Sequence, residues 1–414
     1  MVETAETDIA VVGAGIVGVA CALQLARQGH RVTLVDRQAP GLGASFGNAG
    51  HLATEQVFPI ADLAILKRLP RMLLDPMGPL RMDWKYLPKA MPWFTRLLLN
   101  LRPAPFQRSV AGIRTLNEGS LGAWQRLLGS IGRSELFQED GSLLVFEKPE
   151  SRQALEALRT RMQQQAVPVD FWSAETVREA APQLSPSLLG GLFFPRTGHF
   201  IDPYRVVCEL FEAAKASGVR FVQAQVDGGQ LHSAGVSLAS DQGMLNARQV
   251  LVSCGAHSAK LTAALTGTRV PLDTERGYHI EFDLRDTLLN RPCCPVESAF
   301  YMTPMAGRLR VAGTVELGSI NDPANPKRFD YLERNVRRVM GLTQPVARRW
   351  LGFRPSLPDS LPVIGPSPNE PRMIYAFGHQ HLGLTLAGAT GQLVADCIAG
   401  KAPTWLDSFS VQRF

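Results

Sequence analysis

The first apolar run of the chain is followed by a glycine-rich turn, a helical pattern and a second apolar run. Residues 9–12 are continuously apolar, which is typical of a strand buried on both faces of a parallel sheet. Residues 16–28 are good helix formers, and Gly29 is placed to end that helix. Residues 31–35 alternate toward a second strand. The pattern therefore predicts a strand-helix-strand unit that begins a parallel sheet.

Farther along, the hydrophobic pattern changes several times between helical and strand periods. Residues 38–52 are dense in glycine and other small residues, which predicts a loop whose backbone another group approaches closely. Residues 60–128 are helical in pattern and interrupted by prolines. Strands are expected within residues 141–147, 275–284, 299–305 and 308–317. Helices are expected within residues 154–165 and 331–343. A helix beside a strand or a glycine-rich turn is expected within each of residues 201–226, 247–261 and 376–400.

The turn after the first strand carries the spacing of a dinucleotide-binding motif. Gly13, Gly15 and Gly18 allow, in that order, a tight turn, backbone approach to a pyrophosphate, and close packing of the helix on the strand. Asp36 falls at the end of the second strand, where its carboxylate accepts both ribose hydroxyls and repels a 2′-phosphate. These residues predict that the chain binds FAD or NAD in preference to NADP.

The other end of the chain favours FAD over NAD. A nicotinamide dehydrogenase usually completes its cofactor domain in one block of about 150 residues. Here a second glycine-rich element that begins a helix lies at residues 376–400, near the opposite end of the 414-residue chain. One long ligand that touches both ends of the chain, with a substrate domain inserted between them, suits FAD.

Composition narrows the class of protein. The 414 residues are 45% hydrophobic and 19% charged, which is ordinary for a soluble enzyme of two domains, one of them discontinuous. The net charge of +6 is spread without long blocks, so we interpret it as a solvated surface and expect no nucleic-acid partner. No apolar run reaches the ~20 residues that a membrane-spanning helix needs.

The cysteines and the N-terminal residues indicate a cytoplasmic protein. None of the 6 cysteines has CxxC or zinc-site spacing, so no metal site is expected. Cys21 and Cys397 fall on predicted buried helix faces, where a reduced cysteine behaves as a small hydrophobic residue. The acidic N-terminal residues lead directly into the first strand, which predicts no signal peptide. A reducing, cytoplasmic location is therefore expected.

Five ordered motifs resemble the D-amino acid oxidase-like flavoprotein family, particularly its bacterial D-amino acid dehydrogenase branch. They are the three glycines with Asp36, the small-residue loop 43–50, and residues 250–261, 352–368 and 378–400. The resemblance covers essentially the whole chain. Within the branch, the overall pattern is most similar to bacterial D-hydroxyproline dehydrogenases.

This resemblance implies an α/β and α+β architecture. A discontinuous Rossmann-like FAD-binding domain is expected at residues 1–59, 199–265 and 346–414, and an inserted mixed-sheet substrate-binding domain at residues 60–198 and 266–345. The implied reaction oxidises an amino acid, expected to be a D-amino acid such as D-proline or hydroxy-D-proline. Hydride transfer from the α-carbon to flavin N5 gives an imino acid, which water hydrolyses to the 2-oxo acid.

Three residues are expected to act on the substrate. Arg354 is expected to hold the carboxylate, because a guanidinium makes two parallel hydrogen bonds to a carboxylate and the matching arginine of the family has that role. Tyr278 is expected to be a second donor, with a core tyrosine as the alternative, and His379 to contact the flavin ring or the substrate. Tyr301 and His279 are weaker candidates, because alternation along a strand sends neighbours to opposite faces.

FAD is expected to bind without a covalent link, since no cysteine stands where sarcosine oxidase-like relatives attach flavin. The helix that begins near Thr385 is expected to direct its positive end to the flavin, because helix N-termini bind negative charge. The expected cofactor residues are Gly13, Gly15, Ile16, Val17, Gly18, Asp36, Arg37, Ser45, Gly47, Asn48, Ala49, His51, Val226, Gly255, Gly383, Leu384 and Thr385.

The electron acceptor stays open between a quinone, a protein and oxygen. Residues 60–101 combine aromatic side chains with cations, which suits either a segment at an anionic membrane surface or a helical lid on the substrate domain. The aromatic residues are Trp84, Tyr86, Trp93 and Phe94, and the cations are Lys67, Arg68, Arg71, Lys85, Lys89 and Arg96. Peripheral contact with the inner membrane is therefore expected, with the lid as the alternative.

Two other functions fit the same sequence. One is an oxidase of glycine, sarcosine or a similar amine that passes electrons to oxygen. The other is a flavin-bearing subunit of a heteromeric dehydrogenase complex. The sequence leaves the oligomeric state open as well.

Overall fold

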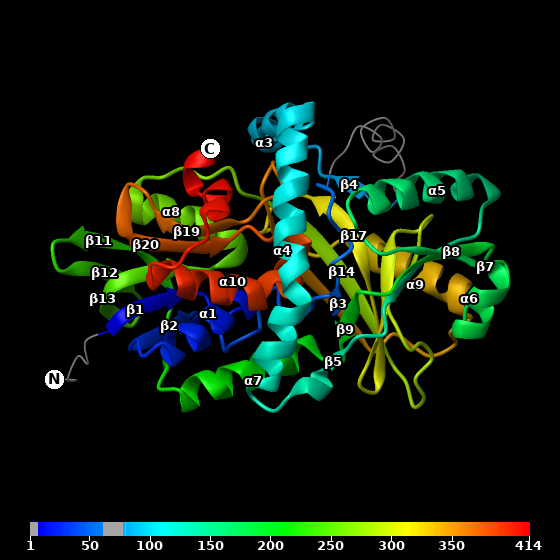
Figure 1. Ribbon diagram of the computed structural model, residues 1–414, viewed down its shortest axis with the longest axis horizontal. Helices are drawn as coiled ribbons and strands as arrows, with labels where there is room; N and C mark the ends of the chain where they lie inside the picture. The colour runs from blue at the N-terminus through cyan, green and yellow to red at the C-terminus, as the bar shows by residue number, and fades with distance from the viewer. Residues whose placement is uncertain (1–6, 61–77, 79) are drawn as a thin grey trace.

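The structure is a computed structural model that describes residues 7–60, 78 and 80–414. Two large sheets lie toward opposite ends of the long axis of the molecule, and the long helix α4 (Pro103–Gly129) runs between them (Figure 1). The cations at positions 67, 68 and 71 that entered the membrane hypothesis lie outside the described residues.

The first sheet has eight strands within the described part of the chain. In spatial order they are β10 (Arg220–Gln223), β2 (Val32–Asp36), β1 (Thr7–Val12), β13 (Gly243–Val252), β12 (Gly235–Ser240) and β11 (Val226–His232), with β20 (Glu370–Phe377) beside β13 and β19 (Val363–Ser367) beside β20. The strands β10, β2, β1, β13 and β20 are parallel, so the sheet begins as the sequence predicts.

Helices cover both faces of this sheet because their apolar sides need burial. The helix α1 (Ile16–Arg27) is almost completely buried and packs between α7 (Pro203–Ala216) and α10 (Gly383–Ile398). The opposite face is covered by α8 (Ser258–Thr266). The carboxylate of Asp202 caps α7 by accepting from the amide of Arg205, as its position in the sequence predicts.

The second sheet is mixed and has nine strands within the described residues. In spatial order they are β18 (Arg348–Ser356), β14 (Asp273–Asp283), β17 (Arg308–Leu317), β16 (Phe300–Met305), β15 (Cys293–Pro295), β6 (Ser142–Phe146), β8 (Gly190–Phe194) and β7 (Asp170–Ser173), with β4 (Leu80–Met82) beside β17. One face of β14 and β17 packs on α9 (Pro326–Met340). The other face lies toward the first sheet and supplies walls of the central cavity.

Other elements lie around the two sheets. They are α3 (Leu87–Asn100), α5 (Pro149–Gln164), α6 (Ala174–Ala180), the small sheet of β3 (His51–Leu52), β9 (Gly198–Phe200) and β5 (Phe137–Gln138), and 3-10 helices at Ser134–Leu136, Gly255–His257, Gln380–Leu382, Thr404–Phe409 and Val411–Arg413. No helix in the described part of the chain is both long and apolar enough to cross a membrane.

The predicted domain boundaries stay a prediction, although two elements lie with a different sheet from the one those ranges imply. The strand β18 pairs with β14 in the second sheet, while its residues fall in the range expected for the cofactor domain. The helix α4 packs on α10, and the indole of Trp124 donates to the carbonyls of Leu384 and Thr385 at 2.9 and 3.0 Å. The helix α4 therefore shares the core of the first sheet.

Candidate active site

One cavity of about 1310 Å³ lies between the two sheets. Ligand sites for drug-sized molecules are about 300–1,000 Å³, so this volume suits a dinucleotide together with a small substrate. The first sheet contributes the ends of β1, β2 and β13, and the second contributes the cavity faces of β14, β17 and β18.

The turn after β1 forms one end of the cavity. A Cβ on Gly13 would lie 2.4 Å from the carbonyl oxygen of Ser253, and a Cβ on Gly18 would lie 1.8 Å from that of Gly13. Both contacts are shorter than atoms tolerate, so this close packing requires glycine at both positions. Gly13, Gly15, Ile16 and Val17 line the cavity, whereas Gly18 lies behind them and packs α1 on the sheet.

Ser45 connects the following loop to the start of α1. Its hydroxyl accepts from the amide of Ile16 at 2.9 Å, and α1 has no side-chain N-cap of its own. A helix start without a cap presents free N–H groups and the positive end of the helix dipole. This end of the cavity is therefore suited to a pyrophosphate.

The carboxylate of Asp36 stands at the end of β2 and lines the same cavity. Its two oxygens accept from the amides of Ala14 and Gln38 at 2.7 and 3.0 Å. Each carboxylate oxygen has a further lone pair, so both remain available to ribose hydroxyls. Beside it, the guanidinium of Arg37 lies 3.0 Å from the Nε2 of His257. Val226 and Gly255 also line this part of the cavity, as the sequence predicts.

The loop that follows Ser45 is held by the second sheet. The buried Arg310 donates to the carbonyls of Phe46 and Asn48 and pairs with Glu281 at 2.6 Å. The Nδ1 of His279 lies 2.9 Å from the carbonyl oxygen of Gly47. Burial and the charge of Arg310 lower the pKa of His279 to about 4, so this histidine is neutral at physiological pH and donates to the carbonyl. Ser45, Gly47, Asn48, Ala49 and His51 all line the cavity.

Trp350 explains the glycine at position 47. A Cβ on Gly47 would lie 2.1 Å from the indole ring, and that ring stacks on His279 with centroids 5.0 Å apart. The indole therefore packs directly on the bare backbone of the loop. Trp350 lines the cavity and was missed in the sequence, because its contact with residue 47 spans most of the chain.

The start of α10 forms another wall. Gly383 and Leu384 line the cavity, and α10 has no side-chain cap. Thr385 does not line it, because its hydroxyl accepts from the amide of Ala53 at 3.0 Å and is fully buried. The prediction that Thr385 contacts the cofactor is therefore wrong for the side chain. The start of α10 still lines the cavity through Gly383 and Leu384, the two residues before Thr385.

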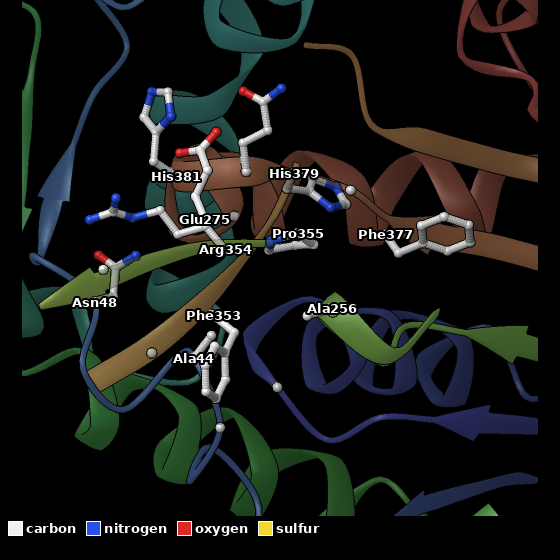
Figure 2. A pocket seen from close by; sticks show the side chains of 18 of the residues that line it. Ala44, Asn48, Ala256, Glu275, Phe353, Arg354, Pro355, Phe377, His379 and His381 are labelled. Carbon is white, nitrogen blue, oxygen red and sulfur yellow. The ribbon is translucent and has the colours of Figure 1, made fainter. Parts of the chain in front are cut away.

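Arg354 lines the cavity on β18 (Figure 2). Its guanidinium lies against the bare backbone of Gly277, where a Cβ would stand 2.6 Å from Cζ. It donates to the carbonyl of Thr314 at 3.3 Å, and within the described residues no carboxylate oxygen lies within ion-pair distance of it. Burial lowers the pKa of Arg354, and the nearby Glu275 opposes that effect. The arginine is therefore positioned to receive a carboxylate from outside the chain.

Glu275 is a cavity residue that the sequence interpretation missed. It lies opposite Arg354 in the β14–β18 pair and accepts from the hydroxyl of Ser356 at 2.8 Å. Burial raises the pKa of Glu275, and the charge of Arg354 opposes that rise. Figure 2 shows Glu275, Arg354 and His381 gathered on one side of the cavity, apart from Ala44 and Ala256.

The expectation for Tyr278 is wrong. Its hydroxyl contacts Glu316 and its ring packs edge-on against Phe329, so its side chain lies on the α9 face of the sheet. Glu275, Gly277 and Tyr278 all line the cavity, but alternation turns the side chains of Arg276 and Tyr278 to the other face of the sheet, so the Tyr278 hydroxyl is engaged there. Arg276 is turned away in the same manner and donates to the carbonyls of Asp322 and Pro323.

His379 lines the cavity, but its ring is engaged with α10. Its Nε2 lies 3.0 Å from the hydroxyl of Thr390, and burial lowers the pKa of His379 to about 3. The imidazole is therefore neutral at physiological pH. The structure gives it a role in anchoring the turn before α10, and the expected contact with flavin or substrate stays a prediction.

Comparisons with known proteins identify one family. Residues 8–397 match the family described as FAD dependent oxidoreductase (DAO). The chain is 34% identical over 416 residues to a D-amino-acid oxidase of Bradyrhizobium diazoefficiens, with 98% of each chain covered. It is 30% identical over 413 residues to a D-amino acid dehydrogenase of Dechloromonas aromatica, with 95% of this chain and 97% of the relative covered.

Solved structures share the fold. A glycine oxidase from Geobacillus kaustophilus superposes with a TM-score of 0.80 at 22% identity over 99% of each chain. An L-proline dehydrogenase from P. horikoshii gives a TM-score of 0.75 at 18% identity, with 99% of this chain and 98% of that chain covered. Both are similar to this chain in architecture alone.

Proposed function

This chain belongs to the DAO family of FAD-dependent oxidoreductases, and we propose on that basis that it oxidises a D-amino acid at the α-carbon. The curated relatives act on D-amino acids by name, and they match over nearly the whole chain. The product is an imino acid, which water converts to the 2-oxo acid; the nitrogen leaves as ammonium from a primary amino acid and stays attached to the carbon chain when the substrate is proline. Within this class we propose D-proline or hydroxy-D-proline as a substrate.

The cavity fits FAD on the evidence of its own walls. The starts of α1 and α10, the carboxylate of Asp36 and the bare backbone at Gly47 all line one continuous space. Asp36 would hold the adenosine ribose, the start of α1 the pyrophosphate, and the start of α10 the negative edge of the flavin. When bound, FAD supplies the acceptor for the hydride that leaves the substrate. We propose that it binds without a covalent link.

Arg354 is the observation that carries the substrate proposal. A half-buried guanidinium with no carboxylate at ion-pair distance among the described residues provides two parallel donors for a substrate carboxylate. Holding the carboxylate there fixes the direction of the α-carbon, because a bidentate contact removes rotation of the anion. The apolar wall from α3 and the preceding segment then surrounds the rest of the substrate. Cavity-lining residues of that wall are Trp84, Leu87, Met91, Trp93, Phe94, Leu97, Leu98 and Leu101.

Turnover on a panel of D- and L-amino acids, glycine and sarcosine tests this function. We expect D-amino acids to reduce an artificial dye through the purified chain, with D-proline or its hydroxy derivative among the best. Parallel measurement of hydrogen peroxide distinguishes a dehydrogenase from an oxidase. Turnover of glycine or sarcosine alone would contradict the proposal. A purified single chain that turns over an amino acid would exclude a purely structural role in a complex.

We further propose a cytoplasmic protein that touches the inner membrane and passes electrons to a quinone. The support is a surface on α3 and the segment before it that combines apolar and cationic side chains. Its exposed apolar residues are Trp84, Met91, Leu98 and Leu99, and its exposed cations are Lys85, Lys89 and Arg96. Figure 1 shows α3 at the edge of the molecule, above the end of α4. Several of these apolar residues also line the cavity, so the two surfaces are continuous.

Binding to lipid vesicles tests this surface. We expect co-sedimentation with anionic vesicles at low salt and release at high salt, because each lysine or arginine near an anionic leaflet contributes about 1 kcal/mol. Replacing Lys89 with glutamine should weaken partitioning roughly fivefold. Vesicles of neutral lipid are the control. Absence of co-sedimentation with anionic vesicles at both salt concentrations would leave α3 as a lid on the cavity.

A further inference from the structure

A histidine and a glutamate face each other behind the cavity wall. The Nε2 of His51 lies 3.7 Å from a carboxylate oxygen of Glu55, and the two residues are only 6% and 4% exposed. Neither of these two atoms has a hydrogen-bond partner among the described residues. Buried polar groups are usually hydrogen-bonded, so two that face each other without bonding require an explanation. Catalytic hydrogen bonds are often long before substrate binds.

The pair is connected to the substrate cavity. His51 lines the cavity together with Gln56 and Tyr301, whereas Glu55 lies behind them. The ring of His51 is 4.6 Å from that of Tyr301, centroid to centroid. The Tyr301 hydroxyl donates to the other oxygen of Glu55 at 3.4 Å, and the amide of Gln56 donates to that hydroxyl at 3.2 Å. One oxygen of the Glu55 carboxylate therefore accepts a hydrogen bond, and the other faces His51 without one.

Among the residues that the structure describes, no fixed charge pairs with His51 or Glu55. The titratable groups that face it are His199 on β9, His381 in the turn before α10, Tyr301 on β16 and Cys294 on β15. Burial lowers the pKa of His199 and of His381 to about 4, and burial raises the pKa of Cys294 to about 12, so these three are neutral near pH 7. The guanidinium of Arg354 lies within electrostatic range of His381.

The proposed reaction needs a proton acceptor in this part of the cavity. A free amino acid carries an ammonium group, which has no lone pair. The α-carbon releases its hydride only when a nitrogen lone pair is available to form the C=N bond. One proton must therefore leave the nitrogen before the oxidation. Arg354 is expected to hold the substrate carboxylate, so the ammonium lies in the same cavity as His51.

We propose that His51 and Glu55 act as a proton-accepting pair for the substrate ammonium, an inference that rests on the proposed oxidation of an amino acid. One N–H bond of the ammonium breaks, its electron pair stays on the nitrogen, and the proton passes to the free ring nitrogen of His51. The Nε2 proton of His51 passes to the Glu55 carboxylate. The pair gains one proton, and no electron is exchanged in this step. His51 contacts the substrate, and Glu55 acts through His51.

The pH dependence of flavin reduction by D-proline distinguishes this role from a structural one. Burial raises the pKa of Glu55 to about 8, so the carboxylate form that accepts a proton is present above that pH and is lost below it. We expect the second-order rate constant of reduction in the wild-type holoenzyme to rise with pH and to level near pH 8. In Glu55→Gln we expect this break in the profile, the levelling near pH 8, to disappear. The rate constant should then rise about tenfold per pH unit toward the pKa of the ammonium itself. Near pH 8 the loss should be roughly 10²-fold.

The matched control is Glu118→Gln, an exposed carboxyl on α4, which should keep the wild-type profile. A Glu55→Gln profile with the wild-type break would overturn the proposal while leaving the proposed function intact. Failure of every amino acid to reduce the wild-type flavin would overturn both.

A second measurement applies if Glu55→Gln does not fold. Infrared spectra of the holoenzyme with carbon-13-labelled glutamate should show a protonated carboxyl group that titrates near pH 8 and that persists in Glu275→Gln, because burial also raises the pKa of Glu275. Absence of such a carboxyl group above pH 6 would overturn the proposal without any measurement of activity.

Discussion

Replacing Arg354 with leucine should raise the apparent dissociation constant of the amino-acid substrate by roughly 30-fold to 5,000-fold. Removing one partner of a desolvated, charge-assisted pair costs about 2–5 kcal/mol, and each 1.4 kcal/mol is about tenfold in affinity. The guanidinium lies over Gly277 in the cavity and has no carboxylate at ion-pair distance among the described residues, so the substrate supplies that partner. Concentration dependence of flavin reduction measures the change.

Two further variants separate this effect from general damage. Arg354→Lys keeps the charge and loses the bidentate geometry, so it should fall between wild type and leucine. Arg349 lies on the same strand with its side chain largely exposed against Glu333, and Arg349→Leu should leave the dissociation constant unchanged. The FAD content of the Arg354 variants should stay at the wild-type level. Unchanged substrate affinity in Arg354→Leu would show that another group binds the carboxylate.

Replacing Gly18 with alanine should remove FAD and destabilise the fold. The new methyl group would stand 1.8 Å from the carbonyl oxygen of Gly13 and 2.6 Å from the hydroxyl of Ser253. Backbone atoms of β1 and α1 cannot separate without opening the pyrophosphate site, so we expect a loss of about 3 kcal/mol or more in the free energy of unfolding. Denaturant unfolding and the ratio of flavin to protein absorbance measure both effects.

Gly119→Ala is the matched control for this substitution. Gly119 lies in the exposed part of α4, and a Cβ there would meet no atom within 4 Å. Alanine should stabilise the helix by about 0.5–1 kcal/mol, because glycine loses more conformational freedom on folding. Full FAD occupancy and normal stability in Gly18→Ala would contradict the close packing of α1 on β1.

Local patterns were sufficient to predict the strand-helix-strand unit at one end of the cavity. The strand, glycine turn and helix over residues 7–27 and the carboxylate of Asp36 follow rules that act within a few turns of chain. The same holds for the Asp202 cap and for the strands β14, β16 and β17, whereas the short strand β15 was not predicted. The sequence predicts these elements separately, and the structure shows that they line one cavity.

The errors arise where a choice depends on tertiary packing. Alternation along β14 defines two faces but not which of them meets the cavity, and the face with Tyr278 packs on α9 instead. Thr385 was assigned to the cofactor from its place in α10, yet its hydroxyl is used by Ala53, far away in the sequence. Glu55 was overlooked although it stands four residues after His51, because a short loop gives no period that would orient the two side chains.

Anaerobic mixing of the purified protein with single enantiomers tests the central claim most directly. The protein should carry a flavin spectrum, mild denaturation should release intact FAD, and D-proline or another D-amino acid should bleach the bound flavin within one turnover while its L-enantiomer does not. The account would be contradicted by a colourless protein that binds NAD tightly, or by a flavin that only L-amino acids or no amino acid can bleach.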